Sequence, residues 1–138
     1  AICIKKNRKV VVQTAVAVKP KIWWTKSFMM SIGKNVEWIF AIDGLPKDSN
    51  KYRVNQDGEK LYDIMLRCAS FGVKTHWQYI IFNYNENDVE HCKSIAQQHG
   101  IKFMQITSGR WGTEVLKSLQ PSKDFSDISG VSIRKYTK

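Results

Sequence analysis

Short apolar runs alternate with amphipathic stretches along most of this chain. The first run, Lys9 to Thr14, is rich in β-branched residues, a pattern typical of a strand buried on both faces. Pro20 then stands where a first helical turn can begin, and Gly33 ends the segment. Between them, apolar residues recur at about helical spacing: Ile22, Trp23, Phe28, Met29 and Ile32. The pattern predicts a strand followed by a helix.

A second unit of the same kind follows. Val36 to Ile42 is apolar, aromatic and β-branched, which predicts a strand, and it ends at the turn sequence Asp43 to Pro46. After a polar loop, Gly72 lies where a left-handed cap would end a helix. The apolar face of this predicted helix is formed by Leu61, Ile64, Met65, Cys68 and Ala69.

The alternation continues to about residue 119. Thr75 to Phe82 is a predicted strand, Asn83 to Asn87 a polar connection, and an amphipathic helix follows that Gly100 ends. Ile101 to Ile106 is the next predicted strand, and Glu114 to Leu119 a short helix. Because parallel strands must be joined by crossovers, the alternation predicts an α/β fold with parallel strands and crossover helices.

Length and composition indicate one soluble globular domain, 1–138. The chain has 138 residues, of which 43% are hydrophobic and 25% charged. No apolar stretch approaches the roughly 18 residues needed to cross a bilayer, so we expect no membrane segment. Residues 112–138 are predicted as a short helix and a polar tail, although Pro121 to Lys138 also fits an interrupted further unit.

The cysteines and histidines indicate no metal site. Cys3, Cys68 and Cys92 are odd in number and widely spaced, which favours incidental thiols in a reduced, cytoplasmic protein. His91 and His99 lie eight residues apart on one predicted helix, but no third ligand is recognisable by spacing.

The positive charge is concentrated at the front of the chain. The net charge is +10, and residues 1–34 hold eight Lys or Arg and no Asp or Glu. Residues 5–34, with Trp23 and Trp24, could bind nucleic acid or another phosphate-rich partner by charge and stacking. The simpler interpretation is a solvated basic face, with at least one of the two tryptophans in the core.

Candidate chemistry lies in the loops that follow the strands, because parallel α/β folds bind ligands beyond the carboxyl ends of their strands. Asp43 and Gly44 directly follow a predicted strand and also fit an ordinary tight turn. Arg53 stands at the far side of the same loop, where its guanidinium could bind a carboxylate or pair with a neighbouring acid. These loops are Thr14 to Ala17, Asp43 to Arg53, Asn83 to Asn87, and Thr107 to Trp111.

The order of several short motifs resembles the radical S-adenosylmethionine (radical SAM) family. Trp38 to Leu45 (WIFAIDGL) and Lys51 to Arg53 (KYR) resemble the family's Ser-Ile-Asp-Gly loop and its trailing Tyr-Arg. Phe71 to Glu90 is similar to the next strand, its asparagine-bearing loop and the following helix. Ala96 to Trp111 resembles the helix end, strand and arginine loop after that. Val10 to Trp24 resembles a Thr-Asn-Gly strand end and a Pro-x-x-Trp-Trp helix.

This resemblance implies a partial (β/α)6 TIM-like barrel over residues 10–111. The family's cofactors are S-adenosylmethionine and a 4Fe-4S cluster, which together yield a 5′-deoxyadenosyl radical that acts on a substrate, here unknown. By the family's pattern, Arg53 would bind the carboxylate of S-adenosylmethionine, and Asp43 and Gly44 would shape the wall beside it. Asn83 would lie near the ribose or adenine.

Two departures from the family pattern qualify these expectations. The chain contains no C-x3-C-x2-C motif, so the cluster ligands are absent from it, and it would be inactive unless joined to an upstream cluster-binding segment. Ala41 replaces a serine hydroxyl, and Ala15 and Val16 stand where the family prefers Asn and Gly. We therefore expect a fragment or a shortened relative of a radical SAM enzyme.

Three further expectations stay open at this point. A barrel that lacks its first strand exposes a sheet edge, which predicts self-association. A non-enzymatic basic α/β module that binds nucleic acid is the alternative to an enzyme, and a small enzyme that uses S-adenosylmethionine without a cluster is a third reading.

Overall fold

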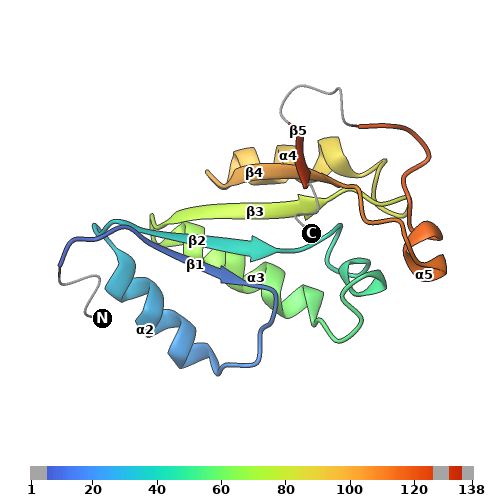
Figure 1. The fold of residues 1–138 in the computed structure, drawn as a ribbon. Helices are drawn as coiled ribbons and strands as arrows, with labels where there is room; N and C mark the ends of the chain where they lie inside the picture. The colour runs from blue at the N-terminus through green and yellow to red at the C-terminus, as the bar shows by residue number, and fades with distance from the viewer. Residues whose placement is uncertain (1–5, 126–130, 135–138) are drawn as a thin grey trace.

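The computed structural model describes residues 6–125 and 131–134 and has an α/β fold (Figure 1). Its five-stranded sheet has the order β1-β2-β3-β4-β5, and all four neighbouring pairs are parallel. The strands are β1 (Val10–Thr14), β2 (Val36–Ala41), β3 (Lys74–Ile80), β4 (Lys102–Ser108) and β5 (Val131–Arg134). The predicted parallel sheet with crossover helices is therefore confirmed.

Three helices form the crossovers between the first four strands. They are α2 (Lys21–Ser31), α3 (Gly58–Ser70) and α4 (Val89–Gln98), and a 3-10 turn, η1 (Ser49–Lys51), precedes α3. Gly72 and Gly100 have φ values of +75° and +67°, so both adopt the left-handed conformation expected after a helix. None of the helices in these described ranges is long and apolar enough to cross a membrane.

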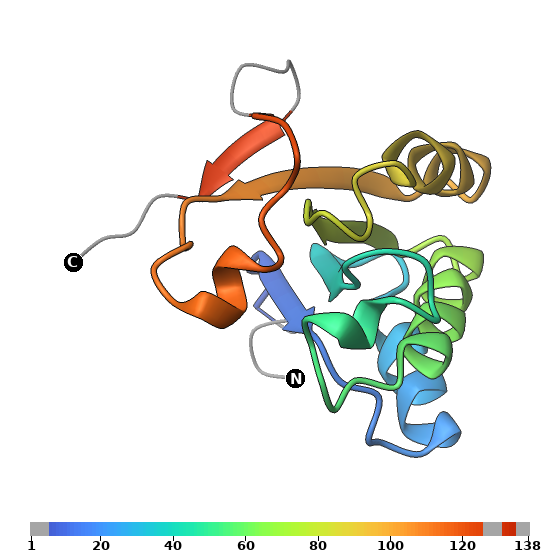
Figure 2. The ribbon, with the colours of Figure 1, turned by 90° about the vertical axis from the view of Figure 1, so that its right-hand side faces the viewer.

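The three crossover helices cover the same face of the sheet, as the view along the strands shows (Figure 2). Alternate strand residues pack beneath them, among them Trp38, Phe40, Trp77 and Tyr79, of which none is more than 4% exposed. Burying side chains of this size contributes about 1.5–3 kcal/mol each. Because the strands follow one another in chain order and the crossover helices lie on one side of the sheet, every crossover has the same handedness.

The first unit differs from its prediction in burial. In β1 the residues alternate between half-buried and exposed, and Val11 is 50% exposed, so the strand is not buried on both faces. The reason is its place at the edge of the sheet, where the described helices cover only one face. In α2, Trp24 and Phe28 are buried, which confirms that one tryptophan of the pair faces the core, but Ile22 and Met29 are exposed.

The last part of the described chain adds a strand rather than only a tail. β4 runs two residues beyond its predicted end, to Ser108, and the short helix α5 (Glu114–Lys117) follows. Val131–Arg134 then pairs with β4 in parallel, which agrees with an interrupted further unit and corrects the simple polar tail for these four residues.

Candidate functional site

Several pockets lie at the carboxyl ends of the strands, and two of them share Tyr52. The larger, of about 440 Å³, lies between the loop after β1 and the segment before α3. Its lining is Ala15, Val16, Tyr52, Arg53, Val54, Asn55 and Gln56. A smaller pocket, of about 140 Å³, includes Tyr52, Ile80, Phe82, Arg110 and Trp111. Because Tyr52 lines both, the two pockets are neighbours on this edge.

Asp43 and Arg53 form an ion pair between these loops. Asp43 is fully buried directly after β2, and its Oδ2 accepts a hydrogen bond from Arg53 Nε at 2.8 Å. Its Oδ1 accepts from the backbone N–H of Ile80 at 2.8 Å, which ties the loop to the end of β3. A buried carboxylate needs such partners, because an unpaired one would cost several kcal/mol. Asp43 therefore fixes the position of the guanidinium.

Arg53 lines the larger pocket. Its side chain is 22% exposed, and neither terminal Nη group hydrogen-bonds to a residue that the structure describes. The guanidinium carbon lies 5.6 Å from the centre of the Tyr52 ring, a cation-π distance. A guanidinium held by one nitrogen still offers its outer edge to an anion, in the bidentate geometry that carboxylates accept.

Ser49 and Gln56 hold the loop that carries Arg53 against the sheet. The backbone N–H of Asp43 donates to Ser49 Oγ at 3.0 Å, and that hydroxyl donates to the Gln56 side-chain carbonyl. The Gln56 amide donates to the backbone carbonyls of Ala15 and Ala41, both at 2.8 Å. One buried glutamine thus connects the ends of β1 and β2 to the loop between β2 and α3.

Gly58 closes this loop. A Cβ atom on Gly58 would lie 2.3 Å from the backbone oxygen of Pro46, so only glycine fits the approach of the loop to the start of α3. Asp57 caps that helix, since its side chain accepts a hydrogen bond from the Lys60 backbone N–H at 3.0 Å. The two ends of the segment from Pro46 to Gly58 are therefore in contact with each other.

Asn85 organises the neighbouring loop, which follows β3. Its Oδ1 accepts from the Phe82 N–H at 2.7 Å and its Nδ2 donates to the Ile80 carbonyl at 2.9 Å, while the residue itself is fully buried. Gly44, with φ of +126°, packs against it, because a Cβ there would lie 3.4 Å from Asn85 Cβ. The loops after β2 and β3 are therefore in direct contact.

An aromatic group surrounds the smaller pocket. The ring of Phe82 lies 4.6 Å from that of Tyr52, 5.5 Å from that of Tyr84 and 6.0 Å from that of Trp111. Burial raises the pKa of the Tyr84 hydroxyl far above its usual value, so this group stays protonated. Its oxygen is buried and has no hydrogen-bond partner among the described residues.

The structure brings together three of the four residues predicted for a site. Asp43, Gly44 and Arg53 lie within one connected set of loops, as the sequence suggested, and Arg53 pairs with a neighbouring acid. Asn83 lines neither pocket, and its amide donates to the Ser118 carbonyl at 2.6 Å. Sequence reasoning missed Gln56 and Asn85, for which only their places in the loops were a signal.

The described cysteines and histidines do not gather into a metal site. Within residues 6–125 and 131–134, no group of three His, Cys, Asp or Glu side chains is placed to hold a metal ion. Cys68 and Cys92 are buried, and burial raises the pKa of each thiol to about 12, so neither is a thiolate at neutral pH. Cys3 lies outside the described residues.

Comparison with protein-family models, with curated proteins and with solved structures finds no match for this chain. What the site can do follows from its own groups. One oriented guanidinium beside a pocket of about 440 Å³ suits an organic carboxylate or phosphate, and the adjoining aromatic group suits a flat ring.

Proposed function

We propose that this chain is part of a radical SAM barrel and that its strand-end loops hold S-adenosylmethionine. The observation that carries the proposal is Arg53, which the buried Asp43 holds beside the larger pocket at the carboxyl edge of a parallel sheet. In the resembling family, the residue at this place binds the carboxylate of the cofactor. The substrate of the whole enzyme stays unassigned.

The topology supports a barrel of the (β/α)6 kind. Strands follow one another in chain order, and α2, α3 and α4 cover one face (Figure 2). A doubly wound sheet would instead reverse its strand order and place helices on both faces. In a barrel the uncovered face becomes the lumen. Here that face carries Gln13, whose side-chain amide donates to the side-chain Oε1 of Gln78 at 3.0 Å.

Two neighbouring pockets of different chemistry support the proposed binding of S-adenosylmethionine. Arg53 would bind the methionine carboxylate in the larger pocket, beside the wall that Asp43 and Gly44 form. The aromatic group would accept the adenine ring by stacking. Asn83, which the family's pattern places near the ribose or adenine, lines neither pocket, so we assign it no contact with the cofactor. When bound, the cofactor would supply radical chemistry to a substrate in the lumen.

The cysteines that the structure describes do not fit a 4Fe-4S cluster. A cluster needs three accessible thiolates close together, whereas Cys68 and Cys92 are buried, protonated and on different helices. We therefore propose that cluster ligands come from a segment other than the described one, and that the chain alone does not cleave the cofactor. The isolated chain is predicted to bind S-adenosylmethionine only weakly.

The location and self-association expected from the sequence belong to the same proposal. Two free, buried thiols suit the reducing cytoplasm. β1 has no partner strand on its outer side among the described residues, and the exposed face of α2 carries Ile22, Met29 and Met30. We propose that the chain self-associates through this side unless another polypeptide segment covers it.

The experiment compares the binding of S-adenosylmethionine to the parent chain and to a variant that has a negative charge in the larger pocket. Val16 lines that pocket and is 52% exposed, so Val16→Glu leaves the core and the Asp43–Arg53 pair intact. We expect affinity for S-adenosylmethionine to fall roughly 10- to 100-fold by calorimetry, since a charge-assisted bond contributes about 1.5–3 kcal/mol. Binding of 5′-methylthioadenosine, which has no carboxylate, should change little.

The matched control is Val18→Glu. Val18 is 78% exposed in the same loop but does not line the pocket, so this variant adds the same charge to the same neighbourhood. If both variants weaken S-adenosylmethionine equally, the effect is general electrostatics and the pocket assignment is wrong. Failure of the wild-type chain to bind either adenosine ligand would refute cofactor binding by these loops.

A further inference from the structure

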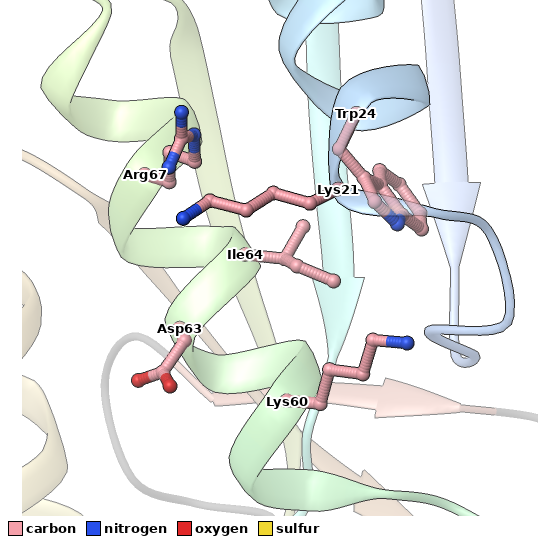
Figure 3. Close-up of a pocket in the computed structure, with 6 residues that line it drawn as sticks. All are labelled: Lys21, Trp24, Lys60, Asp63, Ile64 and Arg67. Atoms are coloured by element: carbon pink, nitrogen blue, oxygen red, sulfur yellow. The ribbon is translucent and has the colours of Figure 1, made fainter.

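We propose that the groove between α2 and α3 binds a small organic anion, in which a phosphate group is attached to a flat apolar body. This groove lies in the helix layer, away from the strand-end pockets, and has a volume of about 280 Å³. Its lining is Lys21, Trp24, Lys60, Asp63, Ile64 and Arg67 (Figure 3). The inference does not rest on the proposed cofactor.

Uncompensated positive charge is the first observation. Lys21 reaches from α2 across to α3 and ends near Arg67, while the carboxylate of Asp63 points away from the space between the helices (Figure 3). Within the part of the chain that the structure describes, neither Lys21 nor Arg67 forms an ion pair. The three basic residues of the lining, Lys21, Lys60 and Arg67, outnumber its one acid, Asp63, and an anion in the groove would reduce the repulsion among them.

The state of Arg67 is the second observation. Its Nε atom is buried and has no hydrogen-bond partner among the described residues, and its guanidinium carbon lies 6.0 Å from the centre of the Phe71 ring. The Phe71 ring holds the guanidinium in place by a cation-π contact, which directs the charge without neutralising it. Phosphate is the anion that matches a guanidinium fork next to a flexible ammonium group.

An apolar floor is the third observation. Trp24 and Ile64 form it, and they are 3% and 8% exposed. The indole N–H of Trp24 donates to the Lys19 carbonyl at 3.1 Å, so the ring is fixed in place and has no free donor to offer. Inorganic phosphate would leave this apolar surface in contact with water, whereas a flat ring attached to the phosphate would cover it.

The test uses adenosine 5′-monophosphate as the probe and the full chain. Titration followed by amide NMR should give saturable shifts at α2 and α3. Lys21→Gln combined with Arg67→Gln should weaken binding at least about tenfold, because two charge-assisted contacts are lost. The control, Lys26→Gln with Lys34→Gln, removes the same charge outside the groove and should cost less than about twofold at moderate salt.

The outcomes separate a built site from general attraction. Equal weakening by the two double variants, or shifts that spread along all basic segments, would overturn the proposal. So would inorganic phosphate binding as tightly as the nucleotide, because the apolar floor would then contribute nothing. If loss of Arg67 unfolds the chain, the exposed substitution Lys21→Glu gives the same comparison, since it reverses one charge and leaves the Phe71 contact in place.

Discussion

Asn85 shows how one side chain can hold two strand-end loops. Its side-chain amide bonds to two backbone groups after β3, the Phe82 N–H and the Ile80 carbonyl. The Tyr79 hydroxyl donates to the Asn85 backbone carbonyl at 2.7 Å. All of these groups are buried. The asparagine side chain therefore satisfies two buried backbone groups of this turn, in addition to the bonds that its neighbours make.

Asn85→Ala should strongly destabilise the fold. It leaves the Phe82 N–H and the Ile80 carbonyl without partners, and each unsatisfied buried group costs about 1–3 kcal/mol. Denaturant unfolding should show a loss of roughly 2–5 kcal/mol, measured against Asn87→Ala, an exposed change in the same loop that should cost under about 0.5 kcal/mol. Similar losses for the two variants would contradict the role of Asn85.

At the same scale, the sequence predicts part of the site. Asp43 and Arg53 stand out because a charged residue directly after a buried strand needs a partner, and the family motif contains both. Asn85 could not be distinguished from Asn83, because the two lie in one polar loop and only the tertiary fold shows which amide points inward. Arg53 and Asp43 lie ten positions apart, so their pairing depends on how the intervening loop folds.

A cluster of ionisable residues lies at the amino-terminal ends of β2 and β3, on the face of the sheet that the helices do not cover. Glu37 pairs with Lys9 at 3.3 Å and lies 3.7 Å from His76. Burial lowers the pKa of His76, which Glu37 offsets in part, so the histidine is neutral in the folded state at neutral pH. Burial raises the pKa of Glu37, but the Lys9 hydrogen bond and the nearby positive charges outweigh it and lower the pKa.

This group predicts a loss of stability in mild acid. The pKa of His76 is lower in the folded state than its ordinary value of 6.5, so the unfolded chain binds the proton more readily. Its contribution to stability is complete above pH 6.5 and is lost as the pH falls below that value. Glu37 acts in the same direction below its ordinary pKa of 4.5. The melting temperature should therefore fall on acidification.

The measurement is the melting temperature at about pH 7.5 and 5.5, on either side of the ordinary histidine pKa. His76→Gln should reduce the difference between the two values. His91→Gln, on the exposed surface of α4, should leave the difference as in the parent chain. An unchanged difference in His76→Gln would show that other groups cause the pH dependence.

Element positions are more predictable than burial. Every crossover helix lies where its periodicity indicates, because glycine caps and apolar spacing are local signals. In α2, by contrast, several apolar residues lie outside the core, and Trp24, Phe28 and Ser31 are the buried positions. Apolar and polar residues are interspersed around α2, so periodicity alone cannot select its buried face.

For the whole molecule, the main feature is a sheet covered on one face. On the other face, Ile80 and Ile106 are buried with Phe82 in a second, smaller cluster. The edge at β1 has no further strand in the described part of the chain, and exposed apolar residues lie on the helix next to that edge. Exposed apolar side chains at a sheet edge are the basis for the self-association that we propose. The sequence predicts the order and direction of the strands and helices. It does not predict what covers the β1 side of the sheet, because that depends on contacts made after the strands and helices have formed.

Self-association should be measurable by sedimentation velocity. Met29→Lys combined with Met30→Lys should weaken association at least about tenfold, because charge on an apolar contact is costly to bury. Val115→Lys, on the exposed surface of α5 and far from α2 in the chain, is the control and should have little effect. A monomer at all concentrations would exclude this contact, as would equal loss in both variants.

The close approach of Gly58 to Pro46 has a consequence for how this fold can diversify. Because the loop from Pro46 to Gly58 leaves the sheet and returns to the same point, its interior can change in length and sequence without moving β2 or α3. Arg53 and Tyr52 lie on that interior, so the two side chains that we propose to contact S-adenosylmethionine belong to a loop that can change without rebuilding the sheet. The fixed requirements are the glycine at its base and the glutamine that ties it down, and relatives with other ligands should differ between these two anchors and the strands.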